Sequence, residues 1–293
     1  MRKWFPLAVL LSLPSFQSVA TDYATYAKAA ACVVRVVARI PDTNSMSFGS
    51  GVVLQDGRIV TNCHVISGAS KVVVMEGPVS TEVERGPGDI AADLCVLQPV
   101  ASSLPAVKAA AGQSLQVGDE VVAIGFGGGG GRSISPGRVT ALFPYRNGHV
   151  IQTTAAFRHG ASGGGLFDRF GNLVGITTFF RRGGIEPAFF AIPVEWVETL
   201  ALSASEPPSR SSPFWMWPQG EQPLFLQVAA YEADGKWAEM EAAARLWTLE
   251  EPEQMQSWEA LSRALMALGE VAQGSSARLR AKQAYESAHT STR

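Results

Sequence analysis

Residues 159–166 have the sequence His-Gly-Ala-Ser-Gly-Gly-Gly-Leu, and the interpretation of the whole chain depends on this stretch. Glycines flank Ser162, leaving its hydroxyl uncrowded and letting the backbone turn tightly enough to direct two N–H groups at one point. A nucleophilic serine needs both features, because a carbonyl group must reach the hydroxyl and the resulting oxyanion must be stabilised. The same residues also suit a flexible surface turn, so other parts of the chain must decide between the two interpretations.

The composition limits the possible classes of protein. A chain of 293 residues can form one large or two modest domains with a sizeable core. The 24 basic residues are balanced by 26 acidic ones, which argues against a nucleic-acid partner, since such a surface needs a basic excess. The 29 glycines and 17 prolines favour short strands joined by many turns.

The N-terminus has the pattern of an export signal. Arg2 and Lys3 precede an apolar run at 4–13, and small residues follow at 18–20. This pattern predicts a signal peptide at 1–20 and an exported protein, periplasmic or secreted. The apolar run is too short to span a bilayer comfortably, and we expect no membrane contact in the mature form.

Short β-branched runs recur about every ten residues between Val33 and Ile192, with glycine and proline between them. An Asp-Gly turn at Asp56-Gly57 separates two such runs, which is typical of a β-hairpin. The pattern predicts an all-β barrel or sandwich in this part of the chain.

The character of the sequence changes near residue 203. Residues 203–213 are rich in serine and proline, and helical spacing begins at Leu224. Together with the signal peptide, these changes predict a β domain at 21–200, a linker at 201–221 and a helical segment at 222–293.

The helical segment contains a partial repeat of period 34, which resembles the tetratricopeptide repeat (TPR). A plain helical hairpin packed on the barrel explains the same residues equally well. A TPR-like segment would imply a protein partner bound through residues 222–293. Residues that align at this period are Leu224, Tyr231, Gly235, Trp237 and Pro252 with Trp258, Leu265, Gly269 and Val271.

A serine nucleophile needs a general base, and histidine suits this role because its unperturbed pKa lies near neutral pH. His64 ends one strand pattern, and Asp93 is the acid that directly precedes another. The stretch around Ser162 also fits the G-x-S-x-G pattern of α/β-hydrolases, which place the acid and the histidine after the serine. The histidine that follows Ser162 is His289, in the C-terminal tail, so that family is excluded.

With the order His, Asp, Ser, the chain resembles the chymotrypsin-fold serine proteases, and most closely the bacterial HtrA-type peptidases. The resemblance covers about residues 33–195 and implies two packed six-stranded β-barrels with the active site between them. The matching blocks, in order, are Gly49-Ser50-Gly51-Val52-Val53-Leu54, Thr61-Asn62-Cys63-His64-Val65, Asp93-Leu94-Cys95-Val96-Leu97, Ala123-Ile124-Gly125, Ile151-Gln152-Thr153, Gly160-Ala161-Ser162-Gly163-Gly164, Gly175-Ile176-Thr177 and Phe190-Ala191-Ile192-Pro193.

The resemblance assigns roles to individual residues. It implies that His64 is the general base, Asp93 the orienting acid and Ser162 the nucleophile, with the backbone N–H groups of Gly160 and Ser162 as the oxyanion hole. The implied activity is that of a serine endopeptidase, which hydrolyses peptide bonds of polypeptide substrates through an acyl-enzyme and needs no cofactor. The alternative is a catalytically weak binding or scaffold protein on a protease fold, acting through its helical C-terminal segment.

The chain departs from its relatives at two places near the serine. Ala161 replaces the aspartate that pairs with a new N-terminus in the digestive enzymes, so activation by that ion pair is not expected. Ala156 replaces the aspartate at the base of the trypsin specificity pocket, so a preference for Lys or Arg is not supported. We expect an apolar substrate pocket formed by Ala156, Phe157, Phe179 and Phe190. No PDZ domain is recognisable.

The cysteines favour a structural disulfide. If the resemblance brings His64 and Asp93 into contact, then Cys63 and Cys95 must also lie close together, and we expect a Cys63–Cys95 disulfide with Cys32 unpaired. A metal site is the competing interpretation, but the sequence has no Cys-x-x-Cys or His-x-x-x-His spacing.

A run of five glycines at 127–131 is the remaining motif. A phosphate-binding loop would need a following Lys-Ser or Lys-Thr pair and a helix, and neither is present in the sequence. We interpret the run as a mobile loop that borders the site.

Overall fold

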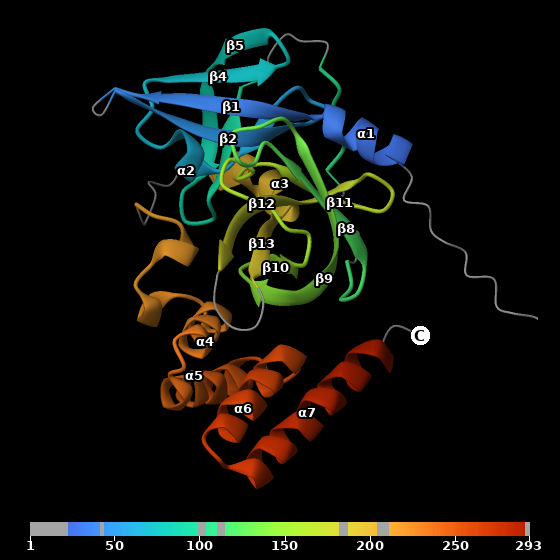
Figure 1. The fold of residues 1–293 in the computed structure, drawn as a ribbon, viewed down its shortest axis with the longest axis vertical. Helices are drawn as coiled ribbons and strands as arrows, with labels where there is room; N and C mark the ends of the chain where they lie inside the picture. The colour runs from blue at the N-terminus through green and yellow to red at the C-terminus, as the bar shows by residue number, and fades with distance from the viewer. Residues whose placement is uncertain are drawn as a thin grey trace, which may run out of the picture.

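A computed structural model describes residues 23–41, 44–98, 104–109, 115–181, 187–203 and 211–290. The predicted signal peptide at 1–20 lies outside these residues. In Figure 1 the chain forms a β-sheet at one end, a closed barrel in the middle and a group of helices at the other end.

The first sheet has seven strands in the order β5-β4-β1-β2-β3-β7-β6. It thus differs from the expected six-stranded barrel, because both the β4–β5 hairpin and β6 extend its edges. β-Branched side chains such as Val34 and Val36 fill its core, where strand alternation buries them. The strands are β1 (Val33–Ile40), β2 (Ser45–Val53), β3 (Ile59–Thr61), β4 (Lys71–Glu76), β5 (Val79–Val83), β6 (Arg85–Asp89) and β7 (Leu94–Leu97).

The second β unit is a closed barrel in the order β10-β13-β12-β11-β8-β9, and all of its neighbouring strands pair antiparallel. Closure leaves no free sheet edge. The predicted fold class of two packed β units is therefore confirmed. The strands are β8 (Glu120–Gly125), β9 (Ser133–Tyr145), β10 (Gly148–Thr153), β11 (Gly165–Asp168), β12 (Leu173–Arg181) and β13 (Ala188–Pro193).

The helices confirm that the C-terminal segment is α-helical. Helix α4 begins at Leu224, the residue at which helical spacing starts in the sequence. Consecutive helices in this segment pack against one another. The helices are α1 (Tyr23–Ala31), α2 (Cys63–Ile66), α3 (Glu195–Ser203), α4 (Leu224–Ala233), α5 (Trp237–Glu250), α6 (Met255–Ala267) and α7 (Val271–Thr290), with the 3₁₀ helices η1 (Phe214–Met216) and η2 (Gln219–Glu221) before α4.

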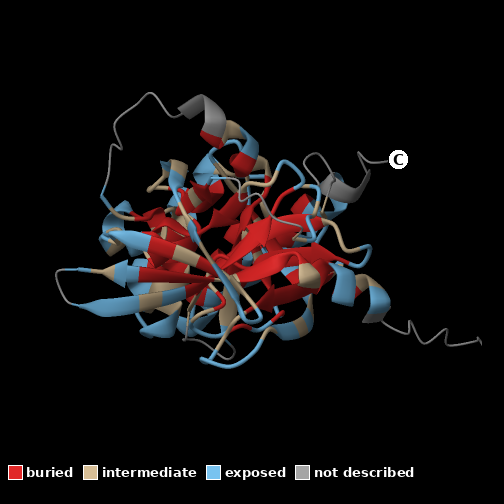
Figure 2. Ribbon diagram, turned by 90° about the horizontal axis from the view of Figure 1, so that it is seen from above, coloured by how far each residue is buried: buried red, intermediate tan, exposed pale blue. Residues whose placement is uncertain are grey.

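One apolar core joins the barrel to the C-terminal helices. Phe143 of β9 stacks on Phe225 of α4, with ring centroids 4.5 Å apart and planes 4° apart, and it also contacts Trp247 of α5. All three side chains are buried and belong to the same cluster. Figure 2 shows buried residues concentrated along the centre of the molecule. Among the described helices, none has the length and apolar character needed to cross a membrane.

Candidate active site

His64 lies where the first sheet meets the barrel. Strand β3 ends at Thr61, and the chain turns at Asn62 into the short helix α2, which carries His64. The Asn62 side chain is fully buried, and its Nδ2 donates to the carbonyl of Asp93 at 2.8 Å and to Thr178 Oγ1 at 3.1 Å. The turn that presents His64 is therefore tied both to the acid and to the barrel strand β12.

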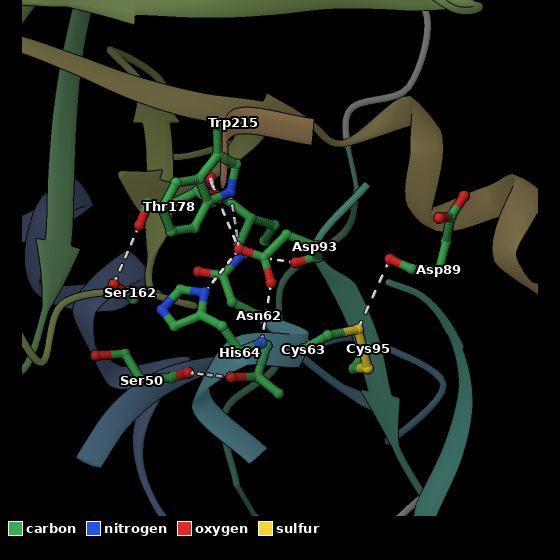
Figure 3. A network of polar contacts seen from close by, with 12 residues as sticks. Ser50, Asn62, Cys63, His64, Asp89, Asp93, Cys95, Ser162, Thr178 and Trp215 are labelled. Atoms are coloured by element: carbon green, nitrogen blue, oxygen red, sulfur yellow. Dashed lines mark hydrogen bonds and ion pairs between the residues drawn. A yellow bond between two sulfur atoms is a disulfide. The ribbon is translucent and has the colours of Figure 1, made fainter. Parts of the chain in front are cut away.

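Asp93 is fully buried and precedes β7 with a backbone φ of 60°. A non-glycine residue in this region is uncommon and marks a position that its surroundings hold in place. Its Oδ1 accepts the backbone N–H of His64 at 2.9 Å, and its Oδ2 lies 2.6 Å from His64 Nδ1. Because a carboxylate only accepts, Nδ1 carries the proton and Nε2 is left free (Figure 3).

Asp93 Oδ2 has a second donor that comes from outside the β domain. The indole Nε1 of Trp215 in η1 donates to it at 3.1 Å. The Trp215 ring also stands at 84° to the His64 ring, with centroids 5.6 Å apart. The acid is thus held by the histidine and by this tryptophan together.

Ser162 lies on a turn that only glycine neighbours allow. Gly160 and Gly163 have φ of 95° and 84°, and a Cβ on either would overlap backbone oxygen atoms, of Phe126 and Ser50 respectively. The Ser162 carbonyl accepts the Ser50 N–H at 2.8 Å, so the turn is fixed to β2 of the first sheet. In this structure Ser162 Oγ donates to the carbonyl of Thr178 at 3.1 Å and not to His64.

The backbone around Ser162 leaves two N–H groups available. Among the described residues, the N–H groups of Gly160 and Ser162 have no hydrogen-bond acceptor within the chain. The carbonyl of His159 accepts the Gly128 N–H at 2.9 Å, and a planar trans peptide therefore directs the Gly160 N–H to the opposite side. The glycine run at 127–131 thus contacts the turn through Gly128.

Hydrogen bonds between uncharged groups hold the Ser162 turn in place. In the digestive serine proteases an ion pair has this role. The carbonyl of Ala161 accepts Thr177 Oγ1 at 2.8 Å and the Gly164 N–H at 2.9 Å. The carbonyl of Gly160 accepts Ser50 Oγ at 2.8 Å. Ala161 itself is 1% exposed, so the position has no room for a solvated carboxylate.

Cys63 and Cys95 form a disulfide, while Cys32 is a buried free thiol. The bridge joins the residue next to His64 with the second residue after Asp93. In the β3–β7 ladder Thr61 pairs with Cys95, so backbone and covalent links together connect the two elements that carry the base and the acid. No cluster of side chains suited to a metal ion occurs among the residues that the structure describes.

A pocket of about 690 Å³ opens beside the turn, and two of the residues expected at a substrate pocket, Ala156 and Phe157, line it. Phe179 and Phe190 do not line it; they stack on each other at 4.7 Å in the core. Adjacent strand side chains alternate between faces, and a register irregularity between Thr177 and Phe179 adjusts which ones face the pocket. The described lining residues are Gly128, Ser135, Ala156, Phe157, Arg158, His159, Phe180, Pro187 and Phe189.

The structure places His64, Asp93 and the Ser162 turn close together (Figure 3). The sequence did not single out Trp215, Ser50, Asn62 or Thr178. Ser50 and Asn62 lie inside two of the sequence blocks that match the HtrA-type peptidases. A search for polar residues in these largely apolar blocks could have identified both. Trp215 is separated from Asp93 by 122 residues, and no local pattern links the two.

Comparison with known proteins is consistent with this geometry. Residues 49–176 match the family model described as a trypsin-like peptidase domain. The chain is 36% identical over 187 residues to the serine endoprotease DegS of Escherichia coli K12. This alignment covers 57% of this chain and 52% of that protein. It is 36% identical over 158 residues to a probable periplasmic serine endoprotease, DegP-like, of Halomonas elongata, covering 51% of this chain and 33% of that protein.

A solved structure gives the same relationship. The crystal structure of the serine endoprotease from Yersinia pestis aligns with a TM-score of 0.56 and 32% identity, over 62% of this chain and 65% of that chain. The chain spans about half, or less, of the length of the two curated relatives. The residues that match the family model, 49–176, lie in both β units and include His64, Asp93 and Ser162.

Proposed function

The β region of this chain is a trypsin-like peptidase domain related to the HtrA-type serine proteases, and on that premise we propose that the protein is a serine endopeptidase. The observation that carries the proposal is the 2.6 Å contact between His64 Nδ1 and Asp93 Oδ2. This contact fixes the tautomer and orientation of the imidazole, which leaves Nε2 free to act as a general base. Its position next to a glycine-flanked serine suits acyl transfer.

In the proposed reaction, Ser162 Oγ rotates away from the Thr178 carbonyl and donates to His64 Nε2. The oxygen attacks the carbonyl carbon of a peptide bond while His64 takes its proton, and Asp93 stabilises the imidazolium that forms. The N–H groups of Gly160 and Ser162 donate to the oxyanion. His64 then protonates the leaving amine, and a water molecule, activated in the same way, hydrolyses the acyl-enzyme.

The lining of the pocket supports an apolar substrate side chain. Phe157 and Phe189 pack with ring centroids 5.2 Å apart, and His159 lies against Phe180 at 5.1 Å, so aromatic surface forms much of the wall. No carboxylate lines the pocket among the described residues, and Arg158 is its charged group. A cationic substrate side chain would find no partner there.

The disulfide and the relatives support a periplasmic location. Disulfides persist in oxidising compartments, and the relative from Halomonas elongata is described as probably periplasmic. For the helical segment we retain the proposal of a protein partner bound through residues 222–293. Support comes from the large apolar side chains that it exposes, such as Leu249 at 79% and Leu279 at 58%.

A fluorophosphonate probe, which reacts with activated serines, tests the proposed function. We expect it to label the wild-type protein and Ser80→Ala, an exposed serine on β5, but not Ser162→Ala. Hydrolysis of a quenched fluorescent peptide library should fall by at least about 10⁴-fold in Ser162→Ala. Equal labelling of wild type and Ser162→Ala would instead support the binding or scaffold alternative.

A further inference from the structure

The segment that follows the barrel returns to the active site. Phe214 of η1 is fully buried, and its N–H donates to the carbonyl of Ala91 at 2.9 Å. Ala91 lies two residues before Asp93, in the same turn. The side chain of Trp215 therefore enters next to the acid, and its Nε1 donates to Asp93 Oδ2. Figure 3 shows the indole directly beside the carboxylate and the His64 ring.

Aromatic packing fixes the plane of the Trp215 ring. The ring stacks on Phe179 with centroids 5.1 Å apart and planes 14° apart, and Phe179 stacks in turn on Phe190. The His64 ring stands nearly perpendicular to the indole. Such contacts restrict the indole to an orientation in which its N–H points at the carboxylate.

The backbone of Trp215 is held from two further directions. Its carbonyl accepts the guanidinium of Arg181, in β12, at 2.8 Å and the side-chain amide of Gln222 at 3.2 Å. Gln222 precedes α4 and also donates to the carbonyl of Trp217 at 2.7 Å. Burial lowers the pKa of Arg181, the residue that donates this hydrogen bond to the Trp215 carbonyl.

We propose that Trp215 is a positioning residue for the reaction, acting through Asp93, and this inference rests on the proposed peptidase function. Asp93 Oδ1 accepts the His64 backbone N–H, and Oδ2 accepts both His64 Nδ1 and Trp215 Nε1. These donors fix the rotation of the carboxylate and hence the direction of the histidine. The segment between the barrel and the helices thereby completes the hydrogen-bonding shell of the acid.

The variant Trp215→Phe removes the N–H but keeps a ring that can stack on Phe179. The matched control is Trp258→Phe in α6, which loses an indole hydrogen bond to the carbonyl of Pro252, outside the site. The measurements are kcat and KM on the peptide substrate, the melting temperature, and the strongly deshielded NMR resonance of the proton between His64 Nδ1 and Asp93. The last measurement reports the geometry of the acid and the base directly.

We expect Trp215→Phe to lower kcat about tenfold, as for the loss of one hydrogen bond to a charged group, while KM changes less than about twofold. The deshielded resonance should shift or broaden, and Trp258→Phe should alter neither quantity. A folded Trp215→Phe protein with unchanged kcat and resonance would overturn the proposal. So would a fall in kcat with an unchanged resonance, since Trp215 would then act without Asp93.

The failure of the proposed function would be recognised separately. In that case the wild type would show no hydrolysis that depends on Ser162, whereas the resonance would still report whether Trp215 positions Asp93. If the Phe variant is unstable, Gln222→Ala provides a second route. This variant removes a hydrogen-bond donor to the Trp215 carbonyl, and it should shift the same resonance in the same direction. An unshifted resonance would count against the proposal.

Discussion

Ser50 joins the first sheet to the turn that carries the proposed nucleophile, because its hydroxyl donates to the carbonyl of Gly160 at 2.8 Å. The same hydroxyl accepts the N–H of Phe126 at 2.9 Å, and the Ser50 N–H donates to the carbonyl of Ser162. One fully buried side chain thus sets the distance between the two β units at the point where they contribute to one site.

Replacing Ser50 with alanine should therefore impair the oxyanion hole. The carbonyl of Gly160 and the N–H of Phe126, both partly buried, would lose their partner, and the turn would be free to reorient. We expect kcat to fall about tenfold in Ser50→Ala with a smaller change in KM, measured by steady-state peptide hydrolysis. Ser133→Ala is the control, since Ser133 also donates to a carbonyl, that of Gly125, but not to the turn. Wild-type kcat in Ser50→Ala would contradict this role.

Gly160 should not tolerate a side chain. Its positive φ and the overlap of a Cβ with the carbonyl oxygen of Phe126 mean that alanine would force the peptide to move. Because this peptide supplies a proposed oxyanion donor, Gly160→Ala should lose about 10²–10³-fold in kcat. Gly131→Ala, where a Cβ meets open space, should keep wild-type kinetics. Similar rates for both variants would show that the Gly160 N–H is not used.

The Cys63–Cys95 bridge should stabilise the fold. It links residues 32 positions apart, for which loop entropy gives a contribution of about 3–4 kcal/mol to the free energy of unfolding. Urea unfolding of Cys63→Ser/Cys95→Ser should reveal this loss relative to Cys32→Ala, which keeps the bridge. If dithiothreitol leaves the unfolding midpoint of the wild type unchanged, the bridge does not contribute.

The free thiol of Cys32 should be unreactive in the folded protein. Burial raises its pKa, a change opposed to a lesser degree by Arg132, so the thiolate fraction at a given pH is smaller than in the unfolded chain. Its contribution to stability is therefore complete below the unfolded-state pKa and is lost as the pH rises through the folded pKa. Alkylation by iodoacetamide at pH 8 should be much slower in buffer than in urea. Equal rates would mean that Cys32 is accessible.

The stack of Phe143 on Phe225 should make the barrel and the helices one cooperative unit. Phe225→Ala would leave a cavity in their shared core and destabilise the protein by about 3–5 kcal/mol. Leu249→Ala, at an exposed site on α5, should have little effect. Thermal unfolding by circular dichroism should show a single transition for the wild type. Two separate transitions, with only the helical one shifted in Phe225→Ala, would contradict this prediction.

The β units and the late helices were predictable because their signals are local. Short β-branched runs with Asp-Gly or glycine turns indicate strands, and the change to helical spacing coincides with the start of α4 at Leu224. Helix α1 was not predicted. It has only nine residues, too few to be stable alone, and its stability comes from packing of residues such as Tyr26 into the core.

The positions of the proposed base, acid and nucleophile could be predicted from the order of these residues along the chain. His64, Asp93 and Ser162 each follow or precede a recognisable strand pattern, so their strands could be aligned with a known arrangement. The lining of the pocket could not be predicted in the same way. Phe179 and Phe180 are adjacent, and a local irregularity in the β12–β13 ladder decides which of them faces the core.

The insertion of Trp215 beside Asp93 also has an evolutionary consequence. A gene fragment that ends with the last strand, β13, would encode the proposed base, acid and nucleophile but omit a donor to the acid. Recombination that exchanged the C-terminal module would have to retain residues 211–222 with the barrel. The gene segment that encodes the complete site would therefore extend past β13, where the β fold ends.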